Sequence, residues 1–226
     1  MSSDRRNRIL KAVLFDWDGT LLDSAEASFH AYVRLFATYG IAFDRESFRR
    51  TYSPDWQRTY VALGLPREVW DEADARWLAL YRQVAADLVP GAREALGRLA
   101  ALGLMAGIVT SGDGSRVRGE IGAFGLEALL KVVVCGEDAP SRKPHPEALQ
   151  LALDRLGVLP GAAAYVGDSP EDVEMARAAG VLSVAVPGGF PNGEALAASR
   201  PDLTAPNLRA ALDFLTGPRQ ATRGGP

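Results

Sequence analysis

The pattern of hydrophobic and polar positions divides the 226-residue chain into short apolar runs and longer amphipathic segments. Short, almost wholly apolar runs are typical of strands buried on both faces of a parallel sheet. Between the later runs, helical periodicity covers about Asp113–Gly122, Pro146–Leu156 and Asp172–Ala179. The apolar runs are Ala12–Phe15, Met105–Val109, Val132–Cys135, Ala163–Val166 and Leu182–Val186. This alternation predicts an α/β fold with a Rossmann-like parallel sheet of at least five strands and right-handed crossovers.

The connection after the first strand is different. Between Leu22 and Leu88 lie about 65 residues without a convincing strand, far more than a simple strand–helix–strand crossover needs. Amphipathic runs separated by glycine and proline predict helices there, at Ser24–Tyr39, Arg45–Thr51, Asp55–Leu63 and Arg67–Ala86. A further helix at Ala92–Leu102 is the expected crossover back to the sheet. The predicted divisions are a Rossmann-like core at 1–22 and 88–217, a helical cap at 23–87 and a disordered tail at 218–226.

Composition excludes several classes of protein. Hydrophobic residues at 47% and charged residues at 23% are ordinary globular values. A net charge of −3, spread along the chain, argues against a nucleic-acid partner. No apolar run approaches the roughly 20 residues that span a bilayer, and the first ten residues lack the apolar stretch of a secretory signal. The single cysteine, Cys135, excludes an internal disulfide and is expected to be buried. We therefore expect a cytoplasmic protein without a membrane partner; its oligomeric state stays open.

The segment VLFDWDGTL at 13–21 carries the first candidate chemistry. Asp16 and Asp18 follow a buried strand directly, and Gly19 permits a tight turn after them. Two carboxylates so close together repel each other unless a cation or a shared proton relieves them. The segment therefore predicts a bound metal, different roles for the two acids, or both. The alternative is an aspartate-rich turn with ordinary loop chemistry.

Polar residues also end the later strands. Thr110 and Ser111 follow the second strand, Lys143 lies in the loop after the third, and Asp168 follows the fourth. Ligands of open parallel sheets bind outside the carboxyl ends of the strands, so these residues are expected to converge. Carboxylates suit Mg²⁺, a hydroxyl beside free backbone N–H groups suits a phosphate, and lysine adds a compact positive charge. The combination favours phosphoryl transfer.

Asp172 has two compatible interpretations. It follows Ser169 by three residues, with Pro170 at the first helical position, which is a capping-box pattern with Asp in place of Glu. It is also placed to support a metal ligand on the preceding strand end. Trp17 is expected to pack in the core, and His145 to begin a helix.

The segments DWDGT, VTSG, RKPHPE and GDSPED, in this order, resemble the four motifs of the haloacid dehalogenase superfamily. The insertion between the first two resembles the helical cap of its phosphoglycolate-phosphatase-like branch. The late segment GGFPNGEAL resembles a glycine–aromatic segment near the site in that branch. The similarity extends from about Lys11 to Leu215. It implies a phosphomonoester hydrolase that acts on a small phosphorylated metabolite with Mg²⁺ as cofactor.

The resemblance implies roles for the acidic residues. Asp16 becomes the nucleophile that forms an aspartyl-phosphate, and also a metal ligand. Asp18 becomes the general acid for the leaving group and then the base that activates water, while its backbone carbonyl binds Mg²⁺. Asp168 becomes a direct metal ligand, and Asp172 supports the site from behind the ligands.

The resemblance also implies the phosphate-binding and substrate residues. Thr110 binds the phosphate through its hydroxyl, helped by the backbone of Ser111, and Lys143 steadies the nucleophile and the transferring group. Selectivity is expected to come from the cap, most of all from the loop Arg50–Gln57. Arg50 or its neighbour Arg49 is a candidate for binding a second anionic group on the substrate, such as a carboxylate.

The same residues also bear on the other activities that the superfamily includes. Members that cleave carbon–halogen bonds lack the second acid, whereas Asp18 is present here. Phosphonate-cleaving relatives use a cap lysine, and Ser24–Asp87 contains no lysine. A sugar-phosphate mutase shares the fold and all four motifs and stays open. A non-catalytic phosphate-sensing or docking module is the alternative of another class, but such a module has no need of Asp18.

Overall fold

Six strands form a parallel sheet at the centre of the computed structural model, which describes residues 10–217. The order across this sheet is β5-β4-β1-β6-β7-β8. The strands are β1 (Ala12–Phe15), β4 (Met105–Val109), β5 (Val132–Val134), β6 (Ala163–Gly167), β7 (Leu182–Ala185) and β8 (Leu203–Thr204). All five predicted strands are present, and the predicted fold class is confirmed. The tail predicted at 218–226 lies outside the described residues.

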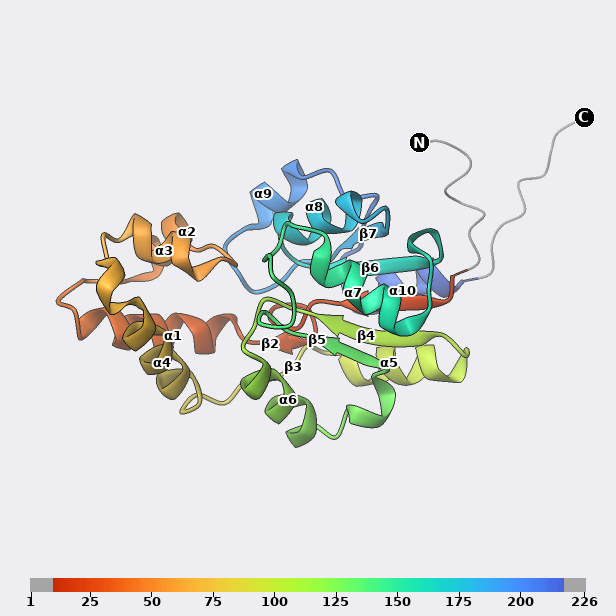
Figure 1. Cartoon of the computed structure of the whole chain (residues 1–226), viewed down its shortest axis with the longest axis horizontal. Helices are drawn as coiled ribbons and strands as arrows, with labels where there is room; N and C mark the ends of the chain where they lie inside the picture. Colours follow the sequence, from red (N-terminus) through yellow and green to blue (C-terminus); the bar gives the residue numbers. More distant parts are fainter. Residues whose placement is uncertain (1–9, 218–226) are drawn as a thin grey trace, which may run out of the picture.

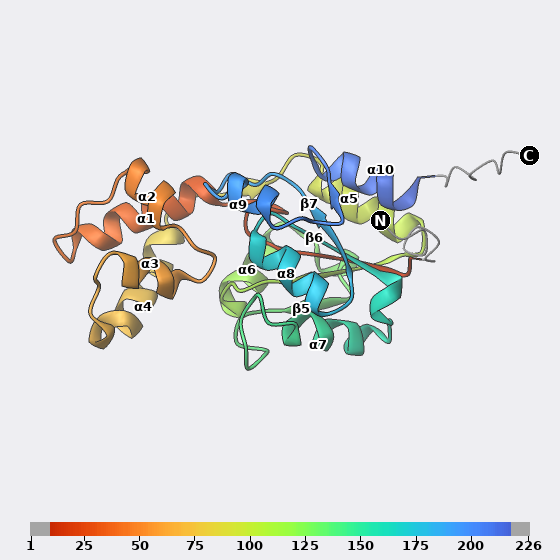
Figure 2. The ribbon, with the colours of Figure 1, turned by 90° about the horizontal axis from the view of Figure 1, so that it is seen from above.

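Helices cover both faces of the sheet, with α5 and α10 on one side and α7 and α8 on the other (Figure 2). Strand residues such as Val13 and Phe15 face the first set of helices, which includes α6, while Ala12 and Leu14 face the second. The helices of the core are α5 (Ala92–Ala101), α6 (Gly114–Ala123), α7 (Glu147–Leu156), α8 (Pro170–Ala178), α9 (Gly193–Ala198) and α10 (Leu208–Thr216). Short 3-10 turns lie at Glu127–Leu129 and Pro160–Ala162. Successive residues of one strand therefore serve two separate apolar layers, which explains the almost wholly apolar strands.

A second lobe of helices follows β1, at the left of Figure 1. It leaves and re-enters the core through β2 (Leu22–Asp23) and β3 (Asp87–Leu88), which pair antiparallel. Its elements are α1 (Ala25–Ala37), α2 (Arg45–Thr51), α3 (Trp56–Ala62), a 3-10 turn at Arg67–Val69 and α4 (Trp70–Tyr81). The lobe therefore stands at the position predicted for the inserted helices.

One predicted helix is shorter than expected. The run Arg67–Ala86 begins as a 3-10 turn, and its α-helix ends at Tyr81. Gln83 and Val84 donate to the carbonyls three residues earlier, which is the geometry of a tight turn rather than of a continuing α-helix. The early end follows because the chain has to reverse toward β3 within a few residues.

Aromatic side chains form the core of the helical lobe. Phe29, Tyr32, Phe36, Phe43 and Phe48 are buried against one another, with ring centroids 4.9 to 6.3 Å apart. The same cluster includes Phe190, which belongs to the loop between β7 and α9. The helical lobe therefore packs directly on a loop of the core, as the views in Figures 1 and 2 agree.

Two further predictions concern burial and membranes. Cys135 is fully buried, as predicted, but lies just beyond β5, where its backbone N–H donates to the carboxylate of Asp138. Among the described residues, no helix has both the length and the apolar character required to cross a membrane.

Candidate active site

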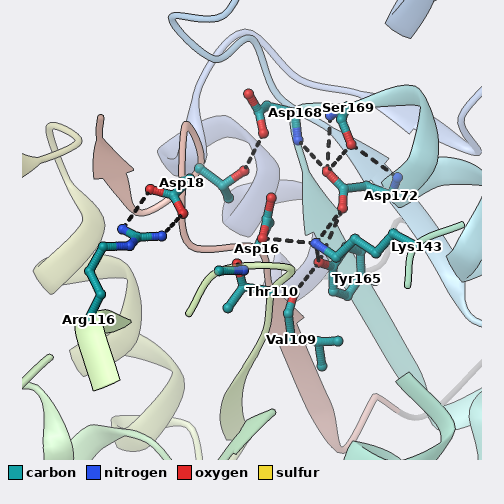
Figure 3. Close-up of polar contacts among 12 residues, drawn as sticks. Asp16, Asp18, Val109, Thr110, Arg116, Lys143, Tyr165, Asp168, Ser169 and Asp172 are labelled. Carbon is teal, nitrogen blue, oxygen red and sulfur yellow. Dashed lines mark hydrogen bonds and ion pairs between the residues drawn. The ribbon is translucent and has the colours of Figure 1, made fainter. Parts of the chain in front are cut away.

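The carboxyl ends of the central strands bring the predicted polar residues together. Because β1 lies between β4 and β6, the chain that leaves each of these strands enters the same space. A cavity of about 90 Å³ opens there, between the sheet edge and the helical lobe. Six predicted site residues line it: Asp16, Asp18, Thr110, Ser111, Lys143 and Asp168. Figure 3 shows five of these residues, all except Ser111, arranged around Asp16.

Asp16 is paired with a buried lysine. The Nζ atom of Lys143 lies 2.8 Å from Asp16 Oδ1 and 2.8 Å from Asp172 Oδ1, and it donates to the hydroxyl of Tyr165 at 2.8 Å. The Lys143 side chain is only 4% exposed. Burial alone would lower the pKa of Lys143, but the carboxylates of Asp16 and Asp172 outweigh it and raise that pKa. The ammonium group is therefore a fixed positive charge beside Asp16.

Asp172 supports this arrangement from the first turn of α8. Its Oδ2 accepts from the backbone N–H groups of Asp168 and Ser169 and from the Ser169 hydroxyl, at 3.2, 3.0 and 2.8 Å. Its Oδ1 accepts from Lys143 at 2.8 Å. The capping box predicted for Ser169 and Asp172 is present. Both carboxylate oxygens of Asp172 are therefore engaged in holding other site residues.

The surroundings of Asp168 fit a divalent metal ion. Carboxylate oxygens of Asp16, Asp168 and Asp172 lie within 4.8 Å of one another. Asp168 is 2% exposed, and its Oδ2 has no hydrogen-bond partner. A Cβ atom at Gly19 or Gly188 would come within 2.3 or 1.9 Å of that oxygen. Oxygen ligands in a closed cradle suit a small, hard cation, and Asp16 with Asp168 are the residues that retain free oxygens for it.

The raised pKa values of Asp16 and Asp168 agree with a metal site between these two acids. Burial raises the pKa of Asp16 to about 7, although Lys143 acts in the opposite direction. Burial also raises the pKa of Asp168 well above its usual value, and the charges of Asp16 and Asp172 add to the effect. Buried carboxylates that raise one another's pKa in this way are stabilised in their charged form by a bound cation.

Asp18 has different surroundings from Asp16. Its carboxylate lies on the side of α6, where Arg116 donates to Oδ1 at 3.1 Å and to Oδ2 at 2.5 Å (Figure 3). It still lines the cavity, and its side chain is 23% exposed. The two acids of the first motif, one residue apart, therefore point to two different cationic partners.

The loop after β4 is predicted to bind phosphate. Thr110 is buried, and its Oγ1 accepts from the backbone N–H of Gly112 at 3.2 Å. Asp113 then caps α6 by accepting from the backbone N–H of Arg116 at 2.8 Å. The loop and the first turn of α6 are thus one short, internally hydrogen-bonded unit at the cavity wall.

The helical lobe supplies the opposite wall of the cavity. From the loop predicted to determine selectivity, residues 52–54 line it, with Tyr52 stacked on Phe190 at 4.5 Å between ring centroids. The lobe's other lining residues are Ser28, Tyr32 and Trp77. The structure does not bring Arg50 to this wall, because its side chain is exposed on α2. Trp56 packs against the guanidinium of Arg142 at 3.9 Å.

Four further polar side chains in the site were missed in the sequence. Tyr165 binds Lys143, Thr20 donates to Asp168 Oδ1 at 3.3 Å, and Asn192 donates to the Asp168 carbonyl at 3.0 Å. Arg116 binds Asp18. A tyrosine in the otherwise small and apolar strand AAYVG was one available signal, because a buried hydroxyl needs a partner. The asparagine of GGFPNGEAL lay in a segment already associated with the site.

The chain is similar to known hydrolases along most of its length. A model of the haloacid dehalogenase-like hydrolase family matches residues 13–186. A curated phosphoglycolate phosphatase from Rhodospirillum rubrum is 36% identical over 196 residues, covering 80% of this chain and 80% of that protein. Another, from Yersinia pestis, is 30% identical over 209 residues, covering 86% of this chain and 88% of that protein.

Solved structures show the same similarity. A candidate phosphoglycolate phosphatase from Lactobacillus plantarum matches with a TM-score of 0.82 at 25% identity, covering 91% of this chain and 99% of that one. A candidate beta-phosphoglucomutase from Thermotoga maritima matches with a TM-score of 0.73 at 27% identity, covering 91% of this chain and 98% of that one. The chain therefore belongs to the haloacid dehalogenase-like hydrolase family, and its relatives mark it as a phosphatase.

Proposed function

We propose that this phosphatase hydrolyses the phosphomonoester of a small metabolite through an aspartyl-phosphate on Asp16, with Mg²⁺ as its cofactor. The observation that carries the proposal is the buried pair of Asp16 and Lys143, 2.8 Å apart, beside an Asp168 oxygen without a hydrogen-bond partner. A nucleophile, a fixed positive charge and a free carboxylate oxygen thus meet in one cavity. These are the components of phosphoryl transfer through a covalent intermediate.

In the first step, a carboxylate oxygen of Asp16 forms a bond to phosphorus while the ester P–O bond breaks. The ammonium group of Lys143 contacts Asp16 directly, so it steadies the nucleophile and the transferring phosphoryl group. Asp18 gives a proton to the leaving oxygen, which departs as an alcohol. Thr110 and the backbone of Ser111 hold the phosphoryl oxygens at the wall formed by the loop after β4.

In the second step, a water oxygen bonds to phosphorus and the bond between phosphorus and Asp16 breaks. Asp18, now a carboxylate, takes a proton from this water. Phosphate leaves, and Asp16 is restored. The same side chain therefore acts first as acid and then as base, which requires that it remain at one place on the cavity wall through both steps.

Asp16, Asp168 and the backbone carbonyl of Asp18 are the groups that would hold Mg²⁺. When bound, the ion would offset the repulsion between the anionic nucleophile and the anionic substrate. Asp172 keeps Lys143 and the start of α8 in place. The family similarity and the three clustered acids support a divalent ion; Mg²⁺ is proposed because hard oxygen ligands suit it.

A cavity of about 90 Å³ favours a small leaving group, and the curated relatives are phosphoglycolate phosphatases. We further propose that the helices between β2 and β3 act as a mobile cap, which admits the substrate and then excludes water. The division into a core and a cap at 23–87 is part of this proposal.

A panel of phosphorylated metabolites assayed with Mg²⁺ tests the proposal. Release of inorganic phosphate from one of them, lost in a chelator and restored by Mg²⁺, is the expected result. The likeness to a candidate beta-phosphoglucomutase makes a mutase the alternative to distinguish. Isomerisation of a sugar phosphate without phosphate release would establish the mutase instead. If neither phosphate release nor isomerisation is observed, only the binding module remains.

A further inference from the structure

A buried arginine holds the carboxylate of Asp18. Arg116, in the first turn of α6, donates to both Asp18 oxygens, and its side chain is only 4% exposed. The two parallel bonds match the planar fork of a guanidinium to the carboxylate, which fixes the orientation of the carboxylate as well as its position. Figure 3 shows this pair on the side of the site opposite Lys143.

The arginine is itself held from behind. Glu120, one turn further along α6, accepts from Arg116 Nη1 at 3.0 Å. The indole N–H of Trp17 donates to the same Glu120 oxygen at 2.7 Å, and Trp17 is fully buried. Since Trp17 precedes Asp18 in the chain, these contacts close a ring from Asp18 through Arg116 and Glu120 back to the first motif. Movement of the Asp18 carboxylate therefore disturbs a connected network.

The close approach of Arg116 to Asp18 depends on Gly112. A Cβ atom at that position would lie 2.6 Å from Arg116 Nη2 and 3.3 Å from Asp18 Oδ2. The loop predicted to bind phosphate therefore leaves room for the ion pair next to it. The loop and the pair form one wall of the cavity.

Arg116 also contacts the helical lobe. Its guanidinium carbon lies 5.0 Å from the ring centroid of Tyr81, the last residue of α4. Tyr81 is buried and stacks on Trp77 at 5.0 Å, and Trp77 lines the active-site cavity. The ring of contacts thus extends from Asp18 to the cavity wall that the helical lobe supplies.

Such a network is not explained by stability alone. Burying an ion pair costs desolvation that the attraction between the charges roughly offsets, so apolar side chains would hold α6 to the first motif at least as well. The network does, however, fix a reactive carboxylate at one place, and preorganisation of that kind is what proton transfer requires.

We propose that Arg116 is a positioning residue, which keeps the Asp18 carboxylate on the leaving-group side of the cavity during both proton transfers. The inference rests on the proposed function of Asp18. In this role Arg116 acts through Asp18 and not by supporting the fold.

The test compares two substrates. An alkyl phosphate needs protonation of its leaving oxygen, whereas the leaving group of 4-nitrophenyl phosphate, 4-nitrophenolate, departs without a proton. In Arg116→Met we expect kcat/KM for the alkyl ester to fall by about 10- to 100-fold, since a well-placed acid contributes about 10²–10⁴-fold. For the aryl ester we expect kcat/KM of the same variant to change by less than about 3-fold. Arg116→Lys should restore part of the loss, because one ammonium group reaches one carboxylate oxygen.

A double variant decides whether Arg116 acts through Asp18. Because Asp18→Asn already removes the group that Arg116 positions, Asp18→Asn with Arg116→Met should be no slower on the alkyl ester than Asp18→Asn alone. Arg118→Met is the matched control. Arg118 lies two residues away on α6, is half-exposed and pairs with Asp138, so its loss should leave both esters unchanged.

Equal losses on the two esters, or losses that multiply in the double variant, would show that Arg116 only supports the fold and would overturn the proposal. If Arg116→Met fails to fold, Arg116→Lys and Trp17→Phe provide the same comparison, since Trp17→Phe removes the hydrogen bond to Glu120 and keeps a buried ring. No selective loss on the alkyl ester in either would also overturn it. Absence of phosphate release by the unmodified protein from both esters would instead refute the proposed function.

Discussion

The two acids of the first motif meet two different kinds of positive charge. Asp16 faces Lys143, a compact ammonium group that it shares with Asp172 and Tyr165 on the side of β6 and α8. Asp18 faces Arg116, a planar guanidinium that takes both of its oxygens, on the side of α6. One residue of sequence separation thus places the two carboxylates in two separate networks.

The difference corresponds to the two proposed roles. A nucleophile needs a free oxygen directed at phosphorus, and the single contact with Lys143 leaves Asp16 one. An acid and base needs a constant location, which a two-point contact provides. Burial raises the pKa of Asp16 to about 7 in the absence of a metal, so its side of the site depends on a cation in addition to Lys143. The following predictions test this contrast.

The largest effect is expected on the Asp16 side. Asp16→Asn keeps the shape of the side chain but cannot form the aspartyl-phosphate. Activity on both alkyl and aryl esters should fall by at least about 10⁴-fold, the order that loss of a nucleophile costs elsewhere. Phosphate release is the measurement, with circular dichroism to show that the fold is kept. Asp23→Asn, an exposed acid in β2, is the control and should be fully active. More than a trace of activity in Asp16→Asn would rule out the covalent mechanism.

The metal is expected to distinguish Asp168 from Asp172. In a chelator, Asp168→Asn should be at least as stable as the unmodified protein, because it removes a buried carboxylate without a partner at Oδ2. Asp172→Asn should be less stable by about 3–5 kcal/mol, since it breaks a buried pair with Lys143. Mg²⁺ should raise the melting temperature of Asp172→Asn but not of Asp168→Asn. The same response to Mg²⁺ in both variants would contradict the assignment of Asp168 as the metal ligand and Asp172 as its support.

The raised pKa of Asp16 gives this contrast a pH dependence. Without a metal, folded Asp16 keeps its proton up to about pH 7, whereas the unfolded chain releases it near the ordinary value of 3.8. The folded state therefore binds more protons between these values, and its stability should fall as the pH rises through that range. Thermal melts in a chelator from about pH 5 to about pH 8 measure this, and Asp16→Asn should show a weaker fall. A rise in stability over the same range would contradict the assignment.

The sequence predicted the Asp16 side of the site better than the Asp18 side. Strands such as Ala12–Phe15 are buried on both faces, so their apolar runs mark them directly. Each strand end then delivers its polar residue to the same edge, whatever the details of packing. Motif residues such as Thr110 and Asp168 were therefore placed by topology alone. The two-residue strand Leu203–Thr204 was missed because two residues carry no period.

Contacts that depend on side-chain direction could not be predicted. Asp18 and Arg116 are 98 residues apart in sequence, and their pairing depends on how α6 packs against the first motif. The i,i+4 spacing of Arg116 and Glu120 indicates an ordinary helical ion pair and gives no sign of a third partner. The same limit applies to the cap, where the side chain of Arg50 is exposed although Tyr52 lines the cavity.

Loss of the Asp18 carboxylate should separate the two chemical steps. Asp18→Asn should still form the phosphoenzyme from an aryl phosphate, because that leaving group needs no proton. It should then hydrolyse the phosphoenzyme about 10²–10⁴-fold more slowly, since the base for water is gone. Rapid-quench measurement should show a burst of nitrophenol, with phosphate retained on the protein. Lack of a burst in Asp18→Asn, with slow turnover, would place Asp18 in the first step only.

A smaller effect is expected from the tyrosine behind Lys143. The Tyr165 hydroxyl accepts from Lys143 at 2.8 Å and donates to the Val109 carbonyl at 2.6 Å. Tyr165→Phe removes both bonds, but Lys143 keeps two carboxylate partners. We expect a loss of about 1–3 kcal/mol in stability from the unpaired buried groups. The accompanying loss of kcat/KM should be similar on both esters, in contrast to Arg116→Met. Selectivity for the alkyl ester would mean that the two networks are not separate.

The smallest effect is expected at the cap loop, where two neighbouring residues make a matched pair. Tyr52 stacks on Phe190 and lines the cavity, so Tyr52→Ala should lower kcat/KM for the best metabolite more than for 4-nitrophenyl phosphate. Arg50 is exposed on α2, and Arg50→Ala should change both values by less than about 2-fold, as for most surface substitutions. Steady-state kinetics on the two substrates provide the measurement. If Arg50→Ala selectively impairs the metabolite, the cap must close further during the reaction, bringing this arginine to the substrate as the sequence suggested. If Tyr52→Ala affects both substrates equally, the stack with Phe190 serves to hold the lobe on the core, and selectivity must come from the other lining residues.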